Sequence, residues 1–132
     1  MVLTKWRILL CAPRSNERVI NLLAKDQNIT FYKKVDNWLK NVDIIISCTT
    51  GSISLNIAKD AIPFMKESSL FADFSSASSA DKRAAANIAE LNKIFYCDVV
   101  IMGGVNLTGV HTPLLYSVLS DTDKTPIGEF LD

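Results

Sequence analysis

The stretch of sequence that decides the fold is VDIIISCTTGSISLNIAKDAI, residues 42–62. Its first part, Val42–Ser47, is a dense β-branched run that is typical of a strand covered on both faces. Its second part, Gly51–Ile62, has the apolar spacing of a helix and stops near Pro63. A buried strand followed at once by a helix predicts one repeat of an alternating strand–helix architecture.

The same alternation extends in both directions along the chain. The predicted strands are Trp6–Cys11, Ile29–Tyr32, Val42–Ser47, Leu70–Phe74, Phe95–Met102 and Pro113–Leu119. The predicted helical segments are one capped by Ser15 or Asn16 and running to Lys25, one or two turns at Asp36–Asn41, and the helices Gly51–Ile62 and Ala77–Leu91. This order predicts an α/β fold: a Rossmann-like, doubly wound, mainly parallel sheet of about six strands, with helices on both faces.

Length and charge narrow the class of protein. The chain has 132 residues, 48% of them hydrophobic, and its 14 basic residues balance 14 acidic ones. We expect one Rossmann-like domain over residues 1–119, incomplete at its N-terminus, and a weakly structured tail over residues 120–132. Zero net charge argues against a nucleic-acid partner, and no apolar run reaches the ~18 residues that span a bilayer. A cytoplasmic location is therefore expected, with the adjacent basic pairs Lys33-Lys34 and Lys82-Arg83 solvated.

The cysteines indicate packing rather than chemistry. Cys11, Cys48 and Cys97 are odd in number and show no C-x-x-C spacing, which argues against a disulfide framework or a zinc site. Each lies in or at the end of an apolar run, where we expect it to be buried. His111 is the one histidine, so no metal site is expected.

Four loops follow predicted strands at the edge where parallel sheets bind ligands. They are Ala12–Asn16, Cys48–Ser52, Ser75–Ser79 and Met102–Asn106. Their Gly, Ser, Thr and Asn residues offer hydroxyl groups and close backbone approach. This composition suits a small-molecule site, although it is also the ordinary composition of loops.

At these loops the sequence resembles the cofactor-binding domain of the 6-phosphogluconate dehydrogenase-like, or β-hydroxyacid dehydrogenase, superfamily. The resemblance runs through VDIIISCTTGSIS (42–54), LFADFSSASSADKRAAA (70–86) and CDVVIMGGVNLTGVHTPLLYSV (97–118). The segment Asp73–Ser76 is similar to the family's Asp-x-Ser-[Thr/Ser] strand end. Met102–Val105 and Thr112–Leu115 are similar to the glycine loop and following strand of a less-characterised branch.

The resemblance implies a nicotinamide cofactor, NADP. In NADP-dependent members an Arg and a Ser or Thr after the second strand hold the 2′-phosphate, and RILLCAPRS (7–15) is similar to that strand. Arg14 and Ser15 would then contact the phosphate, which a guanidinium takes bidentately. The alternative is that Arg14 is an exposed turn residue and Ser15 a helix cap.

The resemblance implies roles at the other loops too. Thr49 and Thr50 would line the ribose, and Ser76 would lie near the nicotinamide or the substrate. Gly103 and Gly104 would present backbone N–H groups to a substrate carboxylate. The alternatives are that Ser76 caps the Ala-rich helix and that the glycine pair is a loop requiring positive φ.

The sequence also departs from the family. It contains no G-x-G-x-x-G, so the family's first strand, glycine loop and first helix are not found. The catalytic Lys is not found either, because Lys124 is followed by Thr125-Pro126 and proline disfavours a helix there. Without the family's first strand, the sheet can form in two ways. Either Arg7–Cys11 pairs directly with Ile44–Ser47, giving the strand order 2-1-3-4-5-6, or a second copy or a complementing chain supplies the missing strand.

Two functions follow. One is an NADP-binding oxidoreductase domain, incomplete and of doubtful activity alone, whose substrate the sequence does not specify. The other is a non-catalytic remnant that acts as an interaction or regulatory domain. A receiver-like domain is disfavoured, since no acidic cluster follows the first strand.

Overall fold

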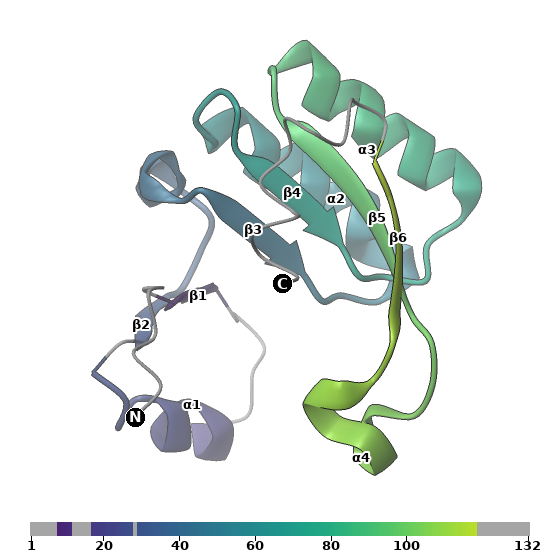
Figure 1. Ribbon diagram of the computed structural model, residues 1–132. Coiled ribbons are helices and arrows are strands. Elements are labelled where there is room, and N and C mark those ends of the chain that lie inside the picture. The colour runs from purple at the N-terminus through teal and green to yellow at the C-terminus, as the bar shows by residue number, and fades with distance from the viewer. Residues whose placement is uncertain (1–7, 12–16, 28, 119–132) are drawn as a thin grey trace. The chain divides into compact units, whose positions relative to one another are not determined.

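The computed structural model describes residues 8–11, 17–27 and 29–118 (Figure 1). The chain divides into two compact units, residues 1–36 and 37–132. The predictions that fall on Arg14, Ser15 and the tail 120–132 lie outside the described residues, as do the proposed caps of the first helix.

The first unit is a single strand–helix–strand repeat. Strands β1 (Ile8–Cys11) and β2 (Ile29–Tyr32) pair in parallel, and α1 (Glu17–Leu23) connects them. The three elements lie where the apolar runs predict them.

The second unit contains a four-stranded sheet in the order β3-β4-β5-β6. Its strands are β3 (Ile44–Ser47), β4 (Leu70–Asp73), β5 (Phe95–Ile101) and β6 (Leu114–Val118). The first three are parallel, and β6 is antiparallel to β5. The helical elements are η1 (Asn37–Asn41), α2 (Gly51–Ala61), η2 (Ile62–Phe64), α3 (Ser79–Leu91), α4 (Val105–Thr108) and η3 (Gly109–His111).

The α/β class and the mainly parallel pairing are confirmed, whereas one sheet of about six strands is not. The described strands form a sheet of four and a sheet of two. Pairing of Arg7–Cys11 with Ile44–Ser47 stays a prediction.

The two long helices lie on one face of the four-stranded sheet rather than on both. Helices α2 and α3 pack against each other, and α3 packs on β5 (Figure 1). The reason is topological: β3, β4 and β5 are added in one direction, and right-handed crossovers then place successive helices on the same side.

The core is built from the alternation of the central strands. Phe71 and Tyr96 lie on the helix face with their rings stacked at 6.1 Å between centroids. Small helix residues, including Ala58, Ala85 and Ala89, are fully or almost fully buried, which allows the helices to approach closely. The opposite face carries a second buried cluster of Leu70, Ala72, Cys97 and Val99.

Candidate functional site

Three of the predicted ligand loops meet at one edge of the four-stranded sheet. Because β3, β4 and β5 are parallel, the loops Cys48–Ser52, Ser75–Ser79 and Met102–Asn106 all follow carboxyl ends at the same edge. The fourth predicted loop, Ala12–Asn16, lies outside the described residues.

The loops after β3 and β4 touch at Gly51, the first residue of α2. A Cβ atom built on Gly51 would lie 2.7 Å from the backbone carbonyl oxygen of Ser76 and 3.0 Å from the Cα of Ala77. No other residue type fits without moving the backbone. The glycine therefore brings the start of α2 directly against the loop that carries Ser76.

Hydroxyl groups gather around this contact. Thr50 is exposed, and its Oγ1 lies 3.2 Å from the Oγ of Ser52. Thr49 is half-buried, and within the described part of the chain its Oγ1 and the Oγ of Ser47 are buried without a hydrogen-bond partner. The contact at Gly51 places the backbone of Ser76 beside the residue that follows Thr50, and the cofactor roles of Thr49, Thr50 and Ser76 stay predictions.

The alternative role for Ser76, as a helix cap, is wrong. Helix α3 begins at Ser79, two residues later than predicted, and its N-cap is Ser78, whose Oγ accepts from the backbone N–H of Asp81. Ser78 also donates to the Asp81 carboxylate at 2.8 Å. Ser76 is exposed and does not cap α3.

A buried carboxylate fixes the end of β4. Asp73 is 1% exposed and accepts hydrogen bonds from the Ser54 hydroxyl of α2 (3.0 Å) and the Tyr96 hydroxyl of β5 (2.9 Å). Its other oxygen accepts from the backbone N–H of Ser75 at 2.9 Å, which turns the chain toward Ser76. One side chain thereby ties together α2, β4, β5 and the loop of the candidate site.

Lys82 of α3 completes this network. Its Nζ lies 2.6 Å from Asp98 Oδ1 and 3.6 Å from Asp73 Oδ2, and it donates to the Asp73 carbonyl at 3.3 Å. Its side chain is 10% exposed, so the expectation that Lys82 is solvated is wrong. The ammonium is instead the counter-ion of two carboxylates.

The network sets the ionisation of its members. Burial would raise the pKa of Asp73, but hydrogen bonds from Ser75 and Tyr96 and the charge of Lys82 outweigh it, so this pKa is lowered. Burial and the Asp73 charge raise the pKa of Tyr96. The carboxylate is thus ionised and the phenol neutral at ordinary pH.

A hollow of about 410 Å³ lies at the carboxyl ends of β4 and β5. Its walls come from residues 74–77 on one side and 99–101 on the other, with Lys82 and Asp98 at its side. Ser76 therefore borders both this hollow and the contact at Gly51.

The glycine pair follows β5 at the same edge. Gly103 has φ +143°, a conformation that side-chain-bearing residues rarely adopt, and Gly104 has an ordinary φ of −86° and precedes α4. The alternative that the loop needs positive φ is correct for Gly103. Binding of a carboxylate by these residues stays a prediction.

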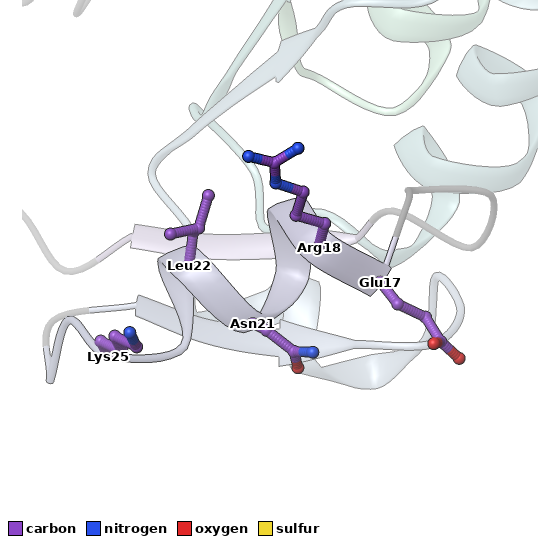
Figure 2. A pocket seen from close by; sticks show the side chains of 5 residues that line it. All are labelled: Glu17, Arg18, Asn21, Leu22 and Lys25. Carbon is purple, nitrogen blue, oxygen red and sulfur yellow. The ribbon is translucent and has the colours of Figure 1, made fainter.

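Another hollow, of about 560 Å³, lies beside α1 in the first unit. Figure 2 shows its five side chains, Glu17, Arg18, Asn21, Leu22 and Lys25, spreading from one helix and the turn after it. All five are exposed and point in different directions, so they do not form a convergent binding site.

The cysteines match the prediction in part. Cys97 is buried, and burial together with the Asp98 charge raises the pKa of its thiol to about 11. Cys48 is exposed, contrary to expectation, because it follows the last residue of β3 and lies in the loop. The side chain of Cys11 lies outside the described set.

Neither a metal cluster nor a membrane span is found where the structure is described. In those residues no three His, Cys, Asp or Glu side chains are placed to share a metal ion. The helices in the same ranges are too short or too polar to cross a bilayer.

Together these features define an α/β fold with a mainly parallel four-stranded sheet and polar loops at the edge where its parallel strands end. No protein-family model and no curated protein matches the chain. Solved structures do match, and they show the fold that the resemblance predicts, that of dehydrogenases acting on hydroxyacids and their relatives.

One similar structure is the conserved protein MTH1747, described as structurally similar to 3-hydroxyacid dehydrogenases, with a TM-score of 0.67 and 18% identity over 83% of this chain and 40% of that one. Another is the 3-hydroxyisobutyrate dehydrogenase of Mycobacterium tuberculosis, with a TM-score of 0.61 and 23% identity over 73% of this chain and 33% of that one.

The imine reductase of Myxococcus stipitatus is similar too. A variant in complex with NAD+ has a TM-score of 0.68 and 19% identity over 92% of this chain and 40% of that one. Its complex with NADP+ has a TM-score of 0.59 and 22% identity over 76% and 36%. The chain thus spans well under half the length of the structures it matches.

Proposed function

We propose that this chain is the NADP-binding part of an oxidoreductase similar to the 6-phosphogluconate and β-hydroxyacid dehydrogenases. The observation that carries the proposal is the contact between Gly51 and Ser76, because it brings together the hydroxyl-bearing loops that follow two adjacent parallel strands. The carboxyl ends of parallel strands are where doubly wound sheets hold nucleotides. The fold likeness to an imine reductase in complex with NAD+ or NADP+ supports the same choice.

The described residues fit the sugar and nicotinamide parts of the cofactor. The buried, unpartnered hydroxyls of Ser47 and Thr49 at the end of β3 are groups that gain from a hydrogen-bonding ligand. Thr49 and Thr50 would line the ribose, and Ser76 would lie near the nicotinamide. A bound nicotinamide would supply hydride transfer, and the chain's own residues would hold and orient it.

Three further assignments belong to the proposal. Arg14 and Ser15 would hold the 2′-phosphate that distinguishes NADP from NAD. Gly103 and Gly104 would bind the carboxylate of a small substrate whose identity is open. We further propose that the protein acts in the cytoplasm.

The sequence contains no recognisable motif for binding the diphosphate of the cofactor. No G-x-G-x-x-G occurs in it, and neither does an assignable catalytic Lys. We therefore propose that the chain works as a homo-oligomer or with a complementing chain that supplies these groups.

The test is a titration of the purified full chain with NADPH and with NADH, followed by nicotinamide fluorescence. NADPH should bind saturably, and Arg14→Ala should weaken NADPH by about tenfold or more while leaving NADH unchanged. Arg83→Ala is the matched control, because Arg83 is an exposed arginine of α3 and should leave both affinities unchanged.

Equal losses for both cofactors would remove the role of Arg14. No binding of either cofactor at millimolar concentration would overturn the proposal and favour the second function, a non-catalytic remnant that acts through protein contacts.

A further inference from the structure

Within residues 29–118, strand β6 lies at the edge of its sheet and lacks the usual protection. Among the described strands it pairs with β5 alone. Natural edge strands are shielded by charged residues, prolines, bulges or a covering element. The run Leu114–Val118 has no charged residue and no proline, and its register with β5 is continuous.

The register shows which backbone groups of β6 are available for pairing. The N–H of Met102 donates to the carbonyl of Pro113 at 2.9 Å, so this pair is hydrogen-bonded across the two strands. In an antiparallel ladder hydrogen-bonded pairs alternate, so Leu115 and Ser117 also face β5. The N–H and C=O groups of Leu114, Tyr116 and Val118 therefore point away from β5, along the open edge.

The side chains at this edge are apolar and exposed. Leu114, Leu115 and Tyr116 are 38%, 61% and 44% exposed, and the adjoining end of β5 exposes Val100, Ile101 and Met102. Since a large apolar residue carries roughly 150–250 Å² of surface, these six expose on the order of 600 Å². About half of this area lies on β6 itself, against about 800 Å² per partner in a standard interface, so the backbone hydrogen bonds of the edge would hold a small interface.

We propose that β6 pairs with β6 of a second copy of this chain, antiparallel and about a two-fold axis at Tyr116. The outward groups then match in one register: Tyr116 faces Tyr116 of the other copy, and Leu114 faces Val118. Each of these pairs exchanges two backbone hydrogen bonds. The result is one continuous sheet of eight strands, twice the four in each copy.

Two observations favour a second copy over an unrelated partner. The edge is self-complementary, because its apolar residues lie on both sides of Tyr116 and a two-fold axis pairs like with like. The formal net charge of the chain is zero, so two copies do not repel each other at long range. This inference does not depend on cofactor binding.

The experiment measures the mass of the full chain by light scattering and sedimentation over a range of concentrations. A dimer is expected, and Tyr116→Lys should raise its dissociation constant about tenfold or more, because two like charges would face each other across the axis. Leu91→Lys is the control, since Leu91 lies at the end of α3 and is 85% exposed. It should leave the dimer intact.

A cross-link tests the register. In a Cys48→Ser background, Tyr116→Cys should form a disulfide-linked dimer on mild oxidation, because facing hydrogen-bonded residues lie about 5.5 Å apart between Cα atoms, within disulfide reach. Leu91→Cys in the same background should cross-link much more slowly. A monomer at about 100 μM, or a dimer that Tyr116→Lys and Leu91→Lys weaken equally, would overturn the proposal.

Discussion

The two ends of the candidate edge are held in different ways. At the end of β4, every residue from Ser69 to Asp73 is buried, and Asp73 is bonded to two other elements. From the last two residues of β5 onward, residues 100–111 are all exposed, and a backbone hydrogen bond between Met102 and Pro113 closes the return to β6. The β4 end of this edge is therefore held by contacts within the chain, whereas the β5 end is exposed.

The difference suggests what each region is for. The β3–β4 side is preorganised by a carboxylate that costs little to keep charged, because its hydrogen bonds replace water. The β5–β6 side exposes apolar residues that gain free energy when another surface covers them. We infer that cofactor contacts belong to the first region and protein contacts to the second.

The largest effect should come from removing the buried carboxylate. Asp73→Ala leaves the hydroxyls of Ser54 and Tyr96 without their acceptor and leaves Lys82 with Asp98 alone, and breaking a buried ion pair typically costs about 3–5 kcal/mol. Urea denaturation should show this loss in the free energy of unfolding. Asp43→Ala is the control, because Asp43 pairs with Lys66 on the surface and such pairs contribute about 1 kcal/mol or less. Similar losses in both variants would show that the network does not hold the β4 end.

A smaller effect is expected at the contact between loops. Gly51→Ala forces the backbone of Ser76 to move and should cost about 1–3 kcal/mol of unfolding free energy, with weaker NADPH binding. Gly104→Ala is the matched control: its new methyl group meets the flexible side chain of Asn106 and its φ is ordinary. It should cost less than about 1 kcal/mol. If Gly51→Ala is as stable as Gly104→Ala and binds NADPH normally, the candidate site is not organised by this contact.

The sequence predicted the elements well because periodicity is a local property. The β-branched and apolar runs gave all six strands to within two residues at either end, wherever those ends fall in described residues. The partition into two sheets was not predicted, because parallel pairing joins distant segments and the runs do not say which edges meet.

The burial of Lys82 and the N-cap of α3 were predicted wrongly, although the sequence contains a pattern that indicates each. Lys82 stands at i of the pattern i, i+3, i+4, i+7 with Ala85, Ala86 and Ala89, so helical spacing alone places it on the buried stripe of α3. Ser78 precedes Asp81 by three residues, the spacing at which a serine and an acidic residue cap each other, which Ser76 lacks. The Gly51 contact had no such signal, because it depends on two loops meeting.

The smallest effect, and the sharpest test of the Asp73 network, is its response to acid. The pKa of Asp73 is lowered in the folded state, so its contribution to stability is complete above the unfolded pKa of about 4 and is lost as pH falls through the lower folded value. The free energy of unfolding should therefore fall below about pH 4 more steeply in the wild-type chain than in Asp73→Asn, which cannot take up that proton. Urea titrations at pH 7, 4 and 3 measure the two slopes. Parallel slopes would mean that Asp73 keeps its ordinary pKa, and the preorganised character assigned to the β4 end would be lost with it.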